Sequence, residues 1–173
     1  MDLLADKPPE IQVEFEFFDP RPDDEAHIRA LLCAGALANA APPSVADAAA
    51  LAKLLAEQPA VGTLVKADQN LFAFLSAVSL IHQRALPLVA ALTDWLLSKA
   101  TPQPSRDALA RALEPTQPAI GLVVSERMLN TPPELIPDAY DSLLQDISWA
   151  VENEETAQLR ESFRFARLLF LAN

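Results

Sequence analysis

Two apolar runs without a single charged residue, at 71–80 and 119–125, dominate the sequence. Each is too short to cross a membrane and is rich in aromatic or β-branched residues, which is typical of a strand buried on both faces. For 71–80 a buried helix would have a similar composition, so that alternative stays open. Stretches with helical periodicity separate the runs. We therefore expect an α/β (α+β) fold in which helices flank a central mixed sheet.

Three further strands are expected. Residues 12–18 alternate apolar and acidic side chains, so Val13, Phe15 and Phe17 should face the core. Residues 61–66 predict a second strand and 163–171 a last one.

Helices are predicted at 23–38, 45–58, 86–99 and 106–113, and from Thr131 to about residue 152. Ser44, Ser105 and Thr131 are the expected capping residues of the second, fourth and fifth of these helices, because a hydroxyl accepts hydrogen bonds from the first turn. Along the last helix Leu135, Ala139, Tyr140, Leu143, Leu144 and Ile147 should face the core.

The chain length of 173 residues suits one domain. Residues 1–10 are expected to be a disordered tail, and 11–173 a single domain. The start lacks the basic and apolar regions of a signal peptide. Cys33 is the single cysteine, which leaves no internal disulfide; we expect it to be a small buried hydrophobe.

The formal net charge of −11 is concentrated in two blocks. Residues 1–30 contain nine acidic and three basic side chains, and residues 126–162 contain nine acidic and two basic ones. The negative electrostatic field of such a protein repels nucleic acid and anionic lipid and attracts basic proteins. An acidic surface that serves only solubility has the same composition.

No enzyme signature is present. The three glycines, Gly35, Gly62 and Gly121, form neither a dinucleotide-binding motif nor a P-loop. His27 and His82 stand outside any metal-binding pattern, and Ser125 lacks the glycines of a nucleophile elbow. We therefore predict no catalytic, cofactor-binding or metal-binding residue.

The segment 118–145 resembles the signature of the BCCIP family. The family pattern consists of a proline and a glycine that open an apolar strand, a Ser-Glu-Arg block, an Asn-x-Pro-Pro block, and a helix that contains a proline and a tyrosine. The matching residues are Pro118, Gly121, Leu122, Ser125, Glu126, Arg127, Asn130, Pro132, Pro133, Pro137 and Tyr140. Weaker blocks at 13–32, 61–68, 71–80 and 163–171 follow in the family's order. The family's acidic insert between the second and third strands is missing here. Family members also continue beyond the last strand, so the chain is expected to be a shortened version or an incomplete gene model.

The resemblance implies a nuclear and cytoplasmic protein without established catalytic activity. Family members act in nuclear protein export, in the escort of a basic large-subunit ribosomal protein during ribosome biogenesis and, in animals, in cell-cycle control and genome maintenance. The implied fold is similar to that of the GCN5-related acetyltransferases, but their acetyl-CoA loop cannot be placed in this sequence.

The leading hypothesis is an acidic adaptor or chaperone for a basic protein, such as a ribosomal protein, with no cofactor and no direct contact with nucleic acid or membrane. The predicted partner-binding residues are Glu14, Glu16, Asp23, Asp24, Ser125, Glu126, Arg127 and Asn130. Two alternatives are an acyltransferase on the same scaffold and a structural subunit whose edge strand at 163–171 pairs with another chain.

Overall fold

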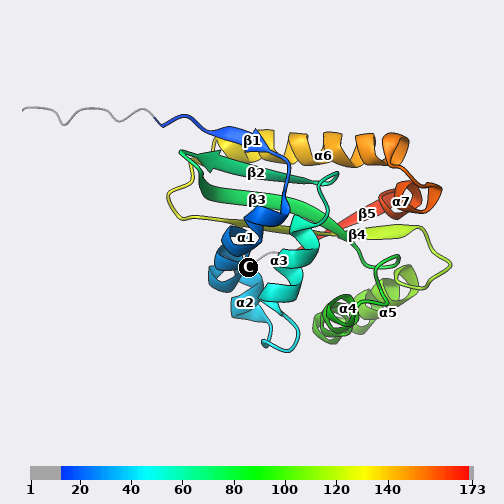
Figure 1. The fold of residues 1–173 in the computed structure, drawn as a ribbon. Coiled ribbons are helices and arrows are strands. Elements are labelled where there is room, and N and C mark those ends of the chain that lie inside the picture. Colours follow the sequence, from blue (N-terminus) through cyan, green and yellow to red (C-terminus); the bar gives the residue numbers. More distant parts are fainter. Residues whose placement is uncertain (1–12, 172–173) are drawn as a thin grey trace, which may run out of the picture.

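The centre of the fold is one mixed β-sheet with the strand order β1-β2-β3-β4-β5 (Figure 1). The computed structural model describes residues 13–171, so the tail expected at 1–10 lies outside the described residues. β1 to β4 pair antiparallel, and β5 pairs parallel with β4. The predicted mixed sheet is therefore confirmed, with strands at Glu16–Phe18, Gly62–Ala67, Asn70–Ser79, Ala119–Arg127 and Phe165–Phe170.

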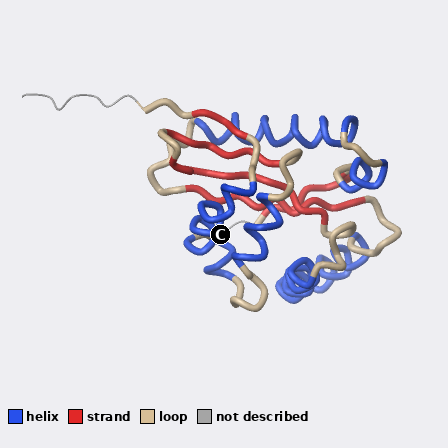
Figure 2. Tube along the Cα trace, viewed as in Figure 1, coloured by secondary structure: helices blue, strands red, loops and turns tan. Residues whose placement is uncertain are grey.

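Helices cover both faces of this sheet (Figures 1 and 2). On one face lies the long helix α6 (Leu135–Asn153). On the other face lie α1 (Glu25–Ala34), α2 (Ala36–Ala40) and α3 (Ala48–Ala56). Beside them lies a helical pair, α4 (Pro87–Lys99) and α5 (Gln103–Ala112). Two short helices, η1 (Pro22–Asp24) and α7 (Ala157–Ser162), complete the described fold.

The two central strands supply a hydrophobic core on each side of the sheet. Phe74 and Leu122 belong to the core against α1, α3 and α4, whereas their chain neighbours Leu75 and Val123 belong to the core against α6. This alternation follows from the period of two along a strand. Full burial of one such side chain contributes about 1.5–3 kcal/mol. Residues 71–80 are thus a strand buried on both faces, not a helix.

A two-residue turn joins β2 to β3. Asp68 and Gln69 have φ values of 47° and 69°, and the flanking residues Ala67 and Asn70 pair directly. Positive φ at both central positions matches the twist of the two strands, which is why such turns close hairpins tightly. The β2–β3 connection is therefore as short as a hairpin permits.

The first strand differs from its prediction. Only Glu16–Phe18 pair with β2, and the side chains of Val13 and Phe17 are 44% and 39% exposed. Phe15 is partly buried and meets Phe72 edge-on at 5.1 Å between ring centroids. The prediction that all three face the core was wrong for Val13 and Phe17, because a three-residue edge strand has few neighbours to cover it.

The helix expected at 23–38 is interrupted at Gly35. α1 ends at Ala34, and the extended backbone of Gly35 (φ −87°, ψ −176°) separates it from α2. Cys33 is exposed, which contradicts the prediction of a buried hydrophobe. It lies outside the buried stripe of α1, which consists of Ile28, Leu31 and Leu32.

The prediction that Thr131 caps a helix was wrong. Its hydroxyl donates a hydrogen bond to the Phe72 carbonyl oxygen at 3.0 Å, and α6 begins only at Leu135. Thr131 is 2% exposed. A contact with a distant strand has therefore replaced the local capping bond that its sequence context favours.

Two other capping predictions were also wrong. Asp47, not Ser44, accepts hydrogen bonds from the first turn of α3, at 3.1 Å from Ala49 N and 3.0 Å from Ala50 N. α5 begins at Gln103, before Ser105.

Two features near the C-terminal end of the described chain also differ from prediction. Leu144 of α6, expected to face the core, is 49% exposed. The acidic stretch after α6 contains the helix α7, which the sequence did not indicate.

Candidate protein-binding surface

An acidic hollow of about 660 Å³ lies where β1, η1 and the β2–β3 turn meet. All four N-terminal residues predicted to bind a partner line it, namely Glu14, Glu16, Asp23 and Asp24. Asp19 and Asp68 add two carboxylates, and Arg21, Lys66 and His27 also line the hollow. We call it the first acidic hollow. The turn after β1 folds η1 back beside the strand, which brings these carboxylates together.

Asp24 contributes to this hollow as a structural residue. It is 6% exposed, and its Oδ1 lies 2.5 Å from Lys66 Nζ. Its Oδ2 accepts a hydrogen bond from the Arg21 backbone N–H at 3.1 Å. Both oxygens therefore have partners within the protein. Asp24 is therefore less accessible to a partner protein than Glu14, Glu16 and Asp23, which are exposed.

A second acidic hollow, of about 550 Å³, lies at the C-terminal end of α6. Its charged lining residues are the four carboxylates Asp19, Asp146, Glu154 and Glu155. Asp19 lines both hollows, so the two acidic regions of the surface are continuous. The two acidic blocks of the sequence, separated by a long neutral segment, therefore meet around one residue.

Burial raises the pKa of the Asp146 carboxyl group to about 6, and the negative charge of Asp19 adds to the effect. Hydrogen bonds from the Thr63 hydroxyl, at 3.2 Å from Asp146 Oδ2, and from the Gly62 backbone act in the opposite direction. A positively charged group placed between Asp19 and Asp146 would relieve their mutual repulsion. Such a group would also favour the ionised form of Asp146.

Trp149 also lines the second hollow and is 53% exposed. An indole face beside carboxylates suits a lysine or arginine side chain, because the ring attracts a cation and covers its aliphatic stem. The sequence prediction missed this residue. Its one available signal was that Trp149 falls outside the buried stripe of α6 formed by Ala139, Leu143 and Ala150.

The Ser-Glu-Arg block forms the last three residues of β4, which extends beyond the strand end expected at residue 125. Ser125, Glu126 and Arg127 belong to β4 and pair with Leu75, Phe74 and Ala73 of β3. Successive strand residues point to opposite faces. Ser125 and Arg127 are exposed and line a cavity of about 220 Å³ with Ile136 and Tyr140 of α6. Asn130 is exposed in the turn beyond β4 and is not among the residues that line this cavity.

Glu126 is half-buried against the opposite face, beside the break between α1 and α2. Its Oε1 accepts a hydrogen bond from the Leu37 backbone N–H at 3.4 Å. Burial raises the pKa of the Glu126 carboxyl group, and the backbone N–H groups of Leu37 and Ala36 partly oppose that shift. The first N–H groups of a helix have no partner within the helix, so a carboxylate that accepts hydrogen bonds from them stabilises the fold. The Glu126 carboxyl group therefore makes a structural contact on this face, although Glu126 also lines the cavity beside Ser125 and Arg127.

The described residues offer no further site of a recognisable chemical class. Within 13–171, no three His, Cys, Asp or Glu side chains are grouped closely enough to hold a metal ion. None of the helices in that range is both long and apolar enough to span a membrane.

The sequence matches the family model for BCCIP over residues 10–173. The chain belongs to the BCCIP family. This BCCIP-family chain is 33% identical over 170 residues to the protein BCCIP homolog of Arabidopsis thaliana, covering 96% of the chain and 51% of that relative. It is 36% identical over 151 residues to protein bcp1 of Schizosaccharomyces pombe, covering 84% of the chain and 52% of that relative.

The crystal structure of BCP1 from Saccharomyces cerevisiae has the same fold, with a TM-score of 0.65 at 24% identity, over 84% of this chain and 61% of that one. The likeness to GCN5-related acetyltransferases is not confirmed and stays a prediction. The BCCIP-family chain spans about half the length of the curated relatives it matches.

Proposed function

We propose that this BCCIP-family chain is a non-enzymatic acidic adaptor that binds a basic client protein, such as a ribosomal protein of the large subunit. The supporting observation is the continuity of the two acidic hollows at Asp19. Together they are lined by nine carboxylates and only two cationic side chains, Arg21 and Lys66. Lys66 is already paired with Asp24, so most of the negative charge is uncompensated at the surface.

The chemistry of the surface supports a protein client with lysine and arginine side chains. Carboxylates spread over a wide area attract such a client at long range and raise its association rate. The second hollow adds a short-range element, because Trp149 and Asp146 together provide an aromatic face and a carboxylate for one cationic side chain. Glu14, Glu16 and Asp23 are the exposed carboxylates proposed to contact the client from the first hollow.

Family membership supports placing this activity in nuclear protein export and in large-subunit biogenesis, with the protein in nucleus and cytoplasm. A newly made ribosomal protein carries many positive charges before it meets RNA. An acidic cover would neutralise these charges during transport, and RNA would compete for the same basic surface.

Salt dependence tests the proposal directly. Binding of a purified lysine- and arginine-rich large-subunit ribosomal protein should weaken strongly between about 50 mM and about 500 mM salt, because exposed charges are screened within about 8 Å at physiological ionic strength. The variant with Glu154→Gln and Glu155→Gln should bind more weakly than the wild type. Equal binding at both salt concentrations would exclude the acidic surface as the binding determinant.

A matched control keeps the change in net charge constant. The variant with Asp94→Asn and Asp107→Asn removes two exposed carboxylates from α4 and α5, outside both hollows. It should bind the ribosomal protein nearly as well as the wild type. If both double variants lose affinity equally, net charge alone governs binding and the hollows have no specific role.

A further inference from the structure

The second acidic hollow contains a carboxyl group that is partly withdrawn from water. Asp146 of α6 lines this hollow, and its side chain is half-buried. Its Oδ2 accepts a hydrogen bond from the hydroxyl group of Thr63 in β2 at 3.2 Å, and Thr63 is only 1% exposed. The Gly62 backbone N–H also donates to this carboxyl group. Asp146 is therefore held between α6 and β2 by two neutral partners.

The charged groups that line the hollow around Asp146 are other carboxylates. Asp19, which follows β1, and Glu154 and Glu155, which follow α6, are all lining residues. The remaining lining residues are uncharged, namely Pro59, Ala60, Trp149 and Asn153. Arg160 of α7 donates a hydrogen bond to the Glu154 backbone oxygen and is not among the lining residues. A negative charge on Asp146 thus has no compensating cation among the described residues that line the hollow.

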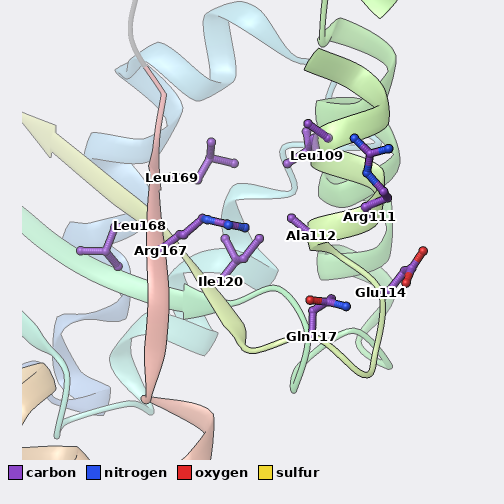
Figure 3. Close-up of a pocket in the computed structure, with 10 residues that line it drawn as sticks. Leu109, Arg111, Ala112, Glu114, Gln117, Ile120, Arg167, Leu168 and Leu169 are labelled. Atoms are coloured by element: carbon purple, nitrogen blue, oxygen red, sulfur yellow. The ribbon is translucent and has the colours of Figure 1, made fainter. Parts of the chain in front are cut away.

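A hollow between β5 and α5, of about 680 Å³, has a different charge (Figure 3). Arg111 and Arg167 line it together with one carboxylate, that of Glu114. Figure 3 shows the Arg167 side chain extending from β5 toward α5. Unlike this hollow, the second acidic hollow attracts a cation without a competing positive charge in its described lining.

The surroundings of Asp146 couple the binding of a cation to the loss of a proton. Partial burial and the negative charge of Asp19 both disfavour the ionised form, and they raise the pKa of the Asp146 carboxyl group to about 6. At that pH about half of the free protein molecules carry a proton on this group. A lysine or arginine side chain beside Asp146 favours the carboxylate instead. The cation and the proton therefore compete for the same carboxyl group.

We propose that the second acidic hollow is a proton-linked site, in which one lysine or arginine side chain of the client displaces a proton from the Asp146 carboxyl group to the solvent. The site presupposes the basic client of the proposed function and adds the regulation of its binding. The indole face of Trp149 covers the aliphatic stem of the bound side chain, and the Asp146 carboxylate pairs with its charged end. The affinity for the client therefore rises as the pH rises through about 6, and acidification favours its release.

Calorimetric titration at pH 6 measures the released proton. The probe is a histidine-free oligolysine peptide with blocked ends, and the titration is repeated at low salt in buffers that differ in ionisation enthalpy. The wild type should release up to about half a proton for each bound peptide, because about half of the Asp146 carboxyl groups are protonated before binding. Asp146→Asn should release almost none. Binding to the wild type without proton release would overturn the proposal.

The pH profile of the affinity locates the proton. Affinity of the wild type for the same peptide should rise about three- to tenfold from pH 5 to pH 7, because only the ionised form of Asp146 binds the cation well. Asp146→Asn should bind more weakly at pH 7 and lose most of this rise. Asp94→Asn removes an exposed carboxylate of α4 outside both acidic hollows, so it is the matched control and should keep the full rise. A full rise in Asp146→Asn would assign the proton to another group and exclude the proposed site.

Two further variants test the neighbours of Asp146 without altering this residue. Asp19→Asn removes a charge that disfavours the ionised form of Asp146, so the midpoint of the pH profile should move to lower pH. His27 lines the first acidic hollow, and imidazole groups also change charge between pH 5 and pH 8. His27→Gln should nevertheless keep most of the rise. An unmoved midpoint in Asp19→Asn, or loss of the rise in His27→Gln, would contradict the assignment to Asp146. Circular dichroism of each variant confirms folding.

The measurements at pH 7 distinguish this site from the wider acidic surface. If the wild type binds the peptide in a salt-sensitive way at pH 7 but releases no proton at pH 6, the acidic adaptor stands and the proton-linked site is excluded. Absence of binding at pH 7 and low salt would exclude both.

Discussion

The carboxyl group of Glu126 occupies the space that a side chain on residue 35 would need. A Cβ atom added to Gly35 would overlap that group, and the Leu37 N–H donates to the same carboxylate. Gly35, at the break between α1 and α2, and Glu126, in the family signature, therefore contact each other although they are 91 positions apart in the sequence. This relationship gives the signature a structural role.

Gly35→Ala is expected to lower the free energy of unfolding by about 0.5–1.5 kcal/mol, because the added methyl group displaces the Glu126 carboxyl group from the Leu37 N–H group that it accepts a hydrogen bond from. Urea unfolding of the variant measures the effect. In Glu126→Ala the overlap disappears but the hydrogen bond to α2 is lost. The double variant should therefore be less destabilised than the sum of the single changes. Simple additivity would show that the two positions are independent.

Lys66→Ala is expected to destabilise the protein by about 3–5 kcal/mol, because it leaves the carboxylate of Asp24 without its cationic partner in a buried place. Thermal unfolding measures the loss. Lys53→Ala is the matched control, since Lys53 and its partner Glu57 are both largely exposed. It should cost less than about 1 kcal/mol. Similar costs for the two variants would contradict the structural role of Asp24.

Asp146 makes stability depend on pH in a definite direction. Its pKa of about 6 in the folded protein lies above the ordinary value of 3.8, so folding favours the protonated form. This contribution is fully present below about pH 4 and is lost as the pH rises through about 6. In Asp146→Asn no carboxyl group titrates at this position, so this pH-dependent loss of stability is absent. The amide oxygen can still accept a hydrogen bond from the Thr63 hydroxyl. Its stability relative to the wild type should rise by about 1 kcal/mol from pH 5 to pH 7, allowing for solvent screening.

Carboxyl chemical shifts recorded by NMR give the Asp146 pKa independently. An unshifted titration near the ordinary value would contradict this account of Asp146, as would identical pH profiles of stability for the wild type and Asp146→Asn.

Trp149→Ala is expected to weaken binding of the basic client about two- to fivefold, because an exposed cation–π contact contributes roughly 0.5–1 kcal/mol. Isothermal titration calorimetry with the ribosomal protein measures the change. Leu144→Ala on the same helix is the control, since Leu144 is exposed to a similar degree and does not line either acidic hollow. Equal losses in the two variants would remove Trp149 from the binding site.

The sequence was most informative where one local property decided the structure. β3 and β4 were predicted correctly because long charge-free runs fit the middle of a sheet with helices on both faces. Thr131 was misassigned because its hydroxyl has a tertiary partner, the Phe72 carbonyl, that no local pattern indicates. Local signals decide such a residue only when no distant group competes for it.

The acidic surface was only partly predictable for the same reason. Glu14, Glu16 and Asp23 follow from the charge pattern alone. Their continuity with Asp146 depends on β1 lying beside β2 and on α6 crossing the sheet, which are long-range facts. Trp149 lies on this surface because α6 directs it away from the core. Only the structure shows that it lies beside the carboxylates of the second acidic hollow.

The parallel pairing of β5 with β4 has a kinetic consequence. Ala67 and Asn70 of the β2–β3 hairpin are three positions apart, whereas Ala119 pairs with Phe165, forty-six positions away. Closing the longer loop costs more chain entropy before any contact rewards it. The hairpin is thus expected to form early during synthesis. β5 is expected to dock after the other four strands because it is the last of the five to be synthesised, so the apolar flank of β4 stays open until then to misassociation with other nascent chains.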